Sequence, residues 1–86
     1  MSIPNVRFKS GSEYYFKEKS GLKPNTLRIQ DKWNDKRFKL LNGFATGKRK
    51  DLTIDIENTL TGESFHRLVK DVSFYGGYYI ISWGVN

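Results

Sequence analysis

The residues best suited to chemistry in this sequence lie close together, between Gly21 and Arg28, where the pattern is G-x-K-x-x-T-x-R. If Thr26 and Arg28 lie in a strand, their side chains share one face, because strand side chains repeat every second residue. Lys23 would then precede them on a loop. An ammonium, a hydroxyl and a guanidinium that meet on one patch suit a phosphate or a polarised carbonyl. We therefore predict a ligand site formed by Lys23, Thr26 and Arg28.

The plain alternative is that Gly21 only ends a helix and that the other three side chains are ordinary surface residues. The residues before the motif favour a helix. Ser10 and Glu13 match the S-x-x-E capping box, which predicts a short helix over about residues 11–19. Gly21 would end that helix in the left-handed conformation, with Pro24 just beyond it. The motif would thus join a helix to the strand that follows.

Most of the remaining sequence indicates strands. Apolar residues alternate with polar ones after residue 51, as expected for a half-buried strand, and glycines near positions 62 and 76 supply turns. Residues 31–36 are typical of a turn, and residues 37–41 fit either one helical turn or an extended segment. The predicted strands are residues 5–8, 25–30, 52–57, 64–74 and 78–83, and the predicted core side chains are Leu52, Ile54, Ile56, Leu68 or Val69, Ile81 and Trp83.

The order of these elements predicts the fold class. A sheet of short strands hides its edges best by curling on itself. We expect an α+β fold, which is a small, curled, mostly antiparallel β-barrel with one or two short helices, one of which closes an end. The last strand is apolar on both faces, which places it inside the sheet. The length of 86 residues predicts a single domain, residues 1–86.

Composition excludes several classes of protein. The sequence has no cysteine, so no disulfide or thiolate metal site can form, and its only histidine, His66, is expected on a sheet face. No apolar run approaches the length of a membrane span, and we expect no signal peptide, because Met1–Pro4 lacks an apolar run of the required length. We expect a cytoplasmic monomer without metal or cofactor.

The positive charge is concentrated in the first part of the chain. The net charge is +6, and residues 1–50 carry 13 Lys and Arg against 4 Asp and Glu. Such a basic field favours an anionic partner, most often nucleic acid, although a generally basic surface gives the same count. The cations that we expect along a nucleic-acid backbone are Arg37, Lys39, Lys48, Arg49 and Lys50. Trp33, Phe38 or a tyrosine would stack on a base.

Taken together, the motif and the element order resemble the ASCH domain, a small barrel similar to the RNA-binding PUA domain. The family signature is G-x-K-x-x-T-x-R after the first helix, and Gly21, Lys23, Thr26 and Arg28 match it in full. Weaker likeness continues at Thr61–Glu63 and Gly77–Ile81, so the match covers about residues 5–84, as in small bacterial or phage-type members. The chain departs from the family at Glu18 and Lys19, where apolar residues are usual. It also lacks the usual F-x-x-G-D step after the motif.

The resemblance implies two possible functions. Some ASCH members are amidohydrolases that act on acetylated cytidine with the motif lysine and threonine, so Lys23 and Thr26 would be the catalytic residues of an enzyme. Those members also use a glutamate from a helical insertion before the last strand, and the three residues between Phe74 and Tyr78 leave no room for one. We therefore expect a non-catalytic RNA- or nucleotide-binding module. A third possibility is a small phage-type accessory protein that binds another protein through Tyr14, Tyr15 and Tyr75.

Overall fold

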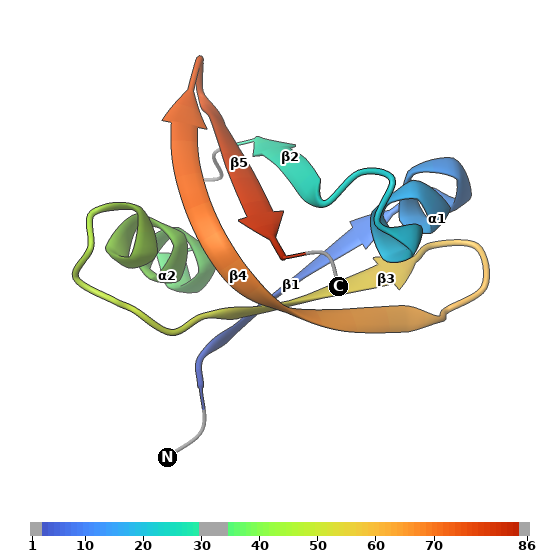
Figure 1. Ribbon diagram of the computed structural model, residues 1–86, viewed down its shortest axis with the longest axis horizontal. Coiled ribbons are helices and arrows are strands. Elements are labelled where there is room, and N and C mark those ends of the chain that lie inside the picture. The colour runs from blue at the N-terminus through green and yellow to red at the C-terminus, as the bar shows by residue number, and fades with distance from the viewer. Residues whose placement is uncertain (1–2, 30–34, 85–86) are drawn as a thin grey trace.

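The computed structural model describes residues 3–29 and 35–84 and leaves aside the side chains of Asp35 and Phe38 (Figure 1). Five strands and two helices follow one another along the described chain. Their order is β1 (Asn5–Ser10), α1 (Ser12–Ser20), β2 (Asn25–Ile29), α2 (Asp35–Ala45), β3 (Thr53–Asn58), β4 (Ser64–Tyr75) and β5 (Tyr78–Trp83).

The strands form one strongly curved sheet in the order β1-β3-β4-β5-β2. Only the β1–β3 pair is parallel, and the other three pairs are antiparallel. The long strand β4 bends across the middle of the sheet, with a register shift between Val69 and Asp71, and so belongs to both halves (Figure 1). The predicted α+β fold with a curled, mostly antiparallel sheet is therefore confirmed. The curl is that of a half-barrel, in which β1 and β2 are the two edge strands.

The core lies inside the curve of the sheet. Apolar side chains from β1, β3, β4 and β5 are buried there together with Tyr15 from α1 and Leu41 from α2. At the ambiguous pair in β4, Val69 is buried and Leu68 is exposed. The strand β5 lies between β4 and β2, as its two apolar faces predicted.

The region after residue 34 is more helical than the sequence indicated. The helix α2 includes residues 37–41, which the sequence left open, and continues through Gly43 to Ala45. Leu41 is fully buried, and Leu40, Phe44 and Ala45 pack against the core. The burial of this apolar stripe outweighs the low helix propensity of a glycine. The predicted turn at residues 31–36 lies largely outside the described residues.

The predicted capping box is wrong. The helix α1 begins at Ser12, its N-cap is Gly11, and no side chain caps it. Ser10 belongs to β1, and its hydroxyl is engaged by Arg28 and Glu18 instead. The other end of the helix agrees with the sequence, because Gly21 is its C-cap in the left-handed conformation, with φ 86°.

The acidic residues of the second half of the chain neutralise part of the basic first half. Arg7 on β1 lies 2.7 Å from Glu57 on β3, and Lys9 lies 3.9 Å from the same carboxylate. Lys19 on α1 lies 3.8 Å from Glu63. The charge asymmetry of the sequence is thus partly cancelled where the two halves pair. Neither described helix is long and apolar enough to cross a lipid bilayer.

Candidate functional site

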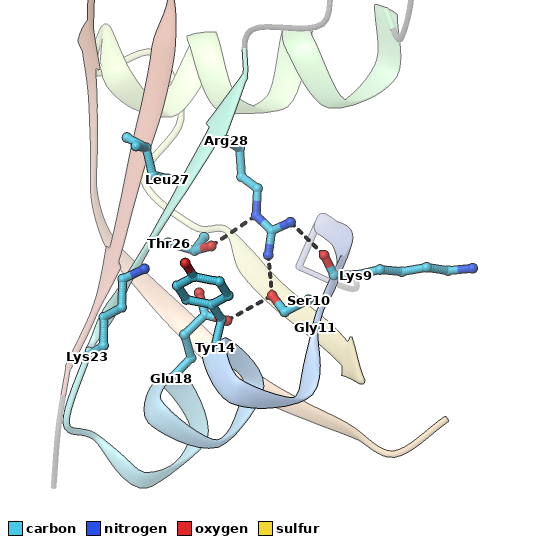
Figure 2. A pocket seen from close by; sticks show the side chains of 9 residues that line it. All are labelled: Lys9, Ser10, Gly11, Tyr14, Glu18, Lys23, Thr26, Leu27 and Arg28. Carbon is cyan, nitrogen blue, oxygen red and sulfur yellow. Dashed lines mark hydrogen bonds between the residues drawn. The ribbon is translucent and has the colours of Figure 1, made fainter. Parts of the chain in front are cut away.

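A cavity of about 350 Å³ lies where α1, the end of β1 and β2 meet. It collects all three predicted site residues, although they come from a loop and a strand (Figure 2). Its lining residues are Lys9, Ser10, Gly11, Tyr14, Glu18, Lys23, Thr26, Leu27 and Arg28.

The pairing of β2 with β5 aims two of these side chains inward. Thr26 pairs with Ile81 and Arg28 pairs with Tyr79, and both of these partners are buried. Thr26 and Arg28 therefore lie on the concave face, as their spacing predicted, while Leu27 is exposed on the other face. The left-handed turn at Gly21 brings the chain back from α1, and the Lys23 amide then donates to the Lys17 carbonyl at 3.0 Å.

The guanidinium of Arg28 connects the two edge strands of the sheet. Its Nε donates to Thr26 Oγ1 at 2.9 Å within β2. Its Nη1 donates to the Lys9 carbonyl at 2.7 Å, and its Nη2 donates to Ser10 Oγ at 2.6 Å, both on β1. The group also lies 4.9 Å from the centroid of the Phe8 ring. Since a guanidinium has five N–H groups, these three bonds leave two for a ligand or for water.

Some features around Arg28 disfavour its charged form, and one favours it. Burial lowers the pKa of Arg28, the negative charge of Glu18 raises it, and the nearby positive charge of Arg37 lowers it. An arginine stays protonated through such changes at neutral pH. Arg28 is therefore a fixed cation in the wall of the cavity.

A buried carboxylate lies beside this cation, and the sequence analysis did not assign it to the site. Glu18 in the last turn of α1 is only 1% exposed, and its Oε1 accepts from Ser10 Oγ at 2.9 Å. Ser10 is the donor in that bond because a carboxylate oxygen accepts, and the same hydroxyl oxygen accepts from Arg28. The second carboxylate oxygen, Oε2, has no hydrogen bond to any residue that the structure describes. The signal available in the sequence was a charged residue at position 18, where the resemblance to the ASCH pattern predicts an apolar one.

Lys23 is the accessible cation of the cavity. Its Nζ lies 5.1 Å from the ring centroid of Tyr14, which is 56% exposed. Within residues 3–29 and 35–84, no carboxylate lies within ion-pair distance of this ammonium. Lys9, by contrast, contributes its backbone, and its side chain points away from the other lining residues (Figure 2).

The cavity therefore offers different chemistry at different points. Lys23 and Arg28 present N–H donors, Glu18 presents an acceptor, and Tyr14 presents an aromatic face. The Thr26 hydroxyl accepts from Arg28, so its own proton remains available to an acceptor. Such a set suits a ligand that carries an anion, an aromatic ring and a polar edge.

Comparison with protein-family models and with curated proteins finds no match for this sequence. The assignment of a function therefore rests on the residues of the cavity and on their geometry. Among the described residues, no three His, Asp or Glu side chains are grouped closely enough to hold a metal ion.

The other predicted contact residues lie outside the cavity. Arg37 on α2 stacks on the Phe8 ring at 4.7 Å and donates to the Arg7 carbonyl, next to Arg28. Lys39 is exposed on the same helix. Lys48, Arg49 and Lys50 follow α2 in the chain, and none of them lines the cavity. In Figure 1, α2 and the loop that follows it lie on the opposite side of the molecule from α1.

The aromatic candidates have separate positions as well. Tyr14 lines the cavity, and Tyr75 is 79% exposed near the β4–β5 turn. Tyr15 is fully buried in the core, so the suggestion that it anchors a protein partner is wrong. Trp33 and the side chain of Phe38 lie outside the described part of the structure.

Proposed function

We propose that this protein is a non-catalytic, ASCH-like module that binds RNA or a nucleotide in the cavity between α1, β1 and β2. One observation carries the proposal: an ammonium that has no ion-pair partner among the described residues, an exposed tyrosine ring and a buried carboxylate line the same cavity. A nucleotide has a feature for each of these groups, namely its phosphate, the face of its base and the edge of its base.

Electrostatic repulsion and base stacking both favour a nucleotide over a simple anion such as inorganic phosphate. A phosphate gains from Lys23, but a phosphate deep in the cavity would also approach the carboxylate of Glu18, which repels it. Stacking of a base on an aromatic side chain contributes about 1–3 kcal/mol. A cavity that takes an aromatic base suits an unpaired base better than a duplex, so single-stranded or structured RNA is the preferred class.

The test is a titration of the whole protein with nucleoside 5′-monophosphates and with a short single-stranded RNA. We expect saturable binding that Lys23→Ala weakens by about tenfold, because a charge-assisted contact is lost. Lys48→Ala removes an equal charge outside the cavity and is the matched control for the mononucleotides. Absence of binding by the wild-type protein, or equal losses in the two variants, would contradict the proposal.

One observation favours a second candidate, an amidohydrolase that acts on an acetylcytidine-like nucleoside. The carboxylate that seemed to be missing has a counterpart in Glu18, which lines the same cavity as Lys23 and Thr26. In such a reaction water adds across the amide C–N bond, which releases acetate and the free amino group of cytidine. Incubation with N4-acetylcytidine tests this candidate: acetate release that is lost in both Lys23→Ala and Glu18→Gln would favour it over the binding module.

A further inference from the structure

The unpaired oxygen of Glu18 is the most selective feature of the cavity. Its side chain is 99% covered by the protein, yet it lines the cavity and has an oxygen, Oε2, without a hydrogen-bond partner among the described residues. Oε2 is not among the fully buried side-chain atoms that lack a partner, so this oxygen is open to the cavity. A ligand that brings N–H groups to this oxygen gains hydrogen bonds there, whereas a ligand that brings a lone pair loses the hydrogen bonds that water would make.

The four standard bases differ at this point. The Watson–Crick edge of guanine carries two neighbouring donors, the ring N1–H and the exocyclic N2–H₂, which match the two oxygens of one carboxylate. Cytosine and adenine each place one amino group beside a ring nitrogen that is an acceptor. Uracil places its single N3–H between two carbonyl oxygens. For each of these three bases, a carboxylate that accepts one hydrogen bond faces a lone pair with its other oxygen.

The neighbours of Glu18 complete the match to guanine. The third group on the same edge of guanine is the O6 carbonyl, which needs a donor. The Thr26 hydroxyl and the Lys23 ammonium are the donors that line the cavity beside Glu18 (Figure 2). The exposed Tyr14 ring can stack on the base, while the phosphate remains at the open side. Single-stranded RNA exposes such edges for recognition.

We propose that Glu18 makes the cavity selective for guanine, by accepting from the N1–H and N2–H₂ groups of the base while Thr26 or Lys23 donates to O6. This inference rests on the proposed function and deepens it, because it names the base that the site takes. Ser10 and Arg28 are positioning residues in this arrangement, since their hydrogen bonds hold the carboxylate in place.

The experiment compares the affinities of GMP, AMP, CMP and UMP for the wild-type protein and for Glu18→Gln. The glutamine keeps an oxygen for Ser10 but replaces Oε2 with an NH₂ group, which opposes the N–H groups of guanine. We expect the wild type to prefer GMP by about tenfold and the variant to lose that preference. Glu13→Gln is the matched control, because Glu13 is an exposed residue of the same helix outside the cavity.

The outcomes separate this inference from the proposed function. Equal affinity of the wild type for all four mononucleotides, or a preference for CMP, overturns the guanine assignment and leaves the binding module standing. A GMP preference that persists in Glu18→Gln overturns the role of Glu18. Absence of binding to every nucleotide and RNA removes the proposed function itself. Thermal melting of both glutamine variants shows whether Glu18→Gln is folded, and inosine monophosphate, which lacks the N2 amino group, tests the same contact on the wild-type protein.

Discussion

Arg28 serves the fold and the site at once. Its three hydrogen bonds end on a hydroxyl of β2, on a carbonyl of β1 and on a hydroxyl of β1 that in turn supports Glu18. Its position in the motif suggests a ligand contact, whereas its bonds also connect two strands that are not paired with each other. A residue with both roles is difficult to test by removal, since loss of binding would follow from loss of the site's structure.

We expect Arg28→Ala to lower the free energy of unfolding by about 2–3 kcal/mol, because charge-assisted hydrogen bonds are lost and a buried carboxylate loses its neighbouring cation. The matched control is Arg7→Ala, which removes an exposed ion pair with Glu57 and should cost at most about 1 kcal/mol. Urea denaturation of both variants measures the difference. Equal losses of unfolding free energy would show that the hydrogen bonds of Arg28 stabilise the fold no more than an exposed ion pair does.

Two exposed tyrosines provide a second comparison at the residue scale. Tyr14→Ala should weaken RNA binding by about 1–3 kcal/mol, because the ring that lines the cavity can no longer stack on a base. Tyr75→Ala removes a similarly exposed ring near the β4–β5 turn and should leave affinity unchanged. Fluorescence titration with one short RNA measures both variants. A larger loss at Tyr75 would place the RNA-binding surface at the β4–β5 turn and contradict the cavity as the binding site.

At the scale of elements, the turn between α1 and β2 sets the position of the motif. Gly21 has a positive φ of 86°, a conformation in which a side chain is strained, and it ends the helix directly before Lys23. Gly11, at the other end of the same helix, has φ −66°, and a Cβ there would meet no atom within 4 Å. Both glycines directly flank α1, and they differ in backbone conformation, so they form a matched pair.

Gly21→Ala should destabilise the protein by about 1–2 kcal/mol, because alanine pays the cost of the left-handed conformation. Gly11→Ala should be neutral or slightly stabilising, because its φ is already that of an ordinary residue. Thermal or chemical unfolding of the two variants gives the comparison. An unchanged stability for Gly21→Ala would mean that the helix can end elsewhere without cost.

The elements also show which parts of the structure the sequence could predict. The faces of β2 and the apolar alternation of β3 and β5 followed from period-two patterns, which depend only on strand geometry. The sequence left residues 37–41 of α2 open between a helical turn and an extended segment, because Gly43 lowers the helix propensity and the burial of Leu41 acts only in the folded protein. Glu18 was left out of the site for a similar reason: its role depends on Ser10 and Arg28, which come from two other strands.

At the scale of the whole molecule, charge is distributed over separate surfaces. Lys23 and Arg28 line the cavity, whereas Lys48, Arg49 and Lys50 belong to the loop after α2, which lies on the side of the molecule away from α1 (Figure 1). The side chains of Arg7 and Lys9 form ion pairs with Glu57 on β3. A mononucleotide can reach only the first of these, and a longer RNA could wrap from one to another.

Replacement of Lys48, Arg49 and Lys50 by alanine should therefore act on long RNA alone. The salt dependence of binding to a long single strand should lose about 2 units of logarithmic slope if all three cations contact phosphates. The affinity for a mononucleotide should stay unchanged, because none of the three lines the cavity. Affinities measured over a range of salt concentrations check both parts. An unchanged slope would show that these three residues do not contact the phosphates of the RNA.

The seam between β1 and β2 has a mechanical consequence. The curved sheet stops short of closing, and the guanidinium of Arg28 on β2 bonds to β1 across the gap beside the cavity (Figure 2). A ligand bound in the cavity would contact both edge strands and would hold them together, as Arg28 does. Ligand binding should then slow hydrogen exchange at the amides of β1 and β2 more than at other amides. The exchange rates of the edge strands would therefore show whether the cavity is occupied.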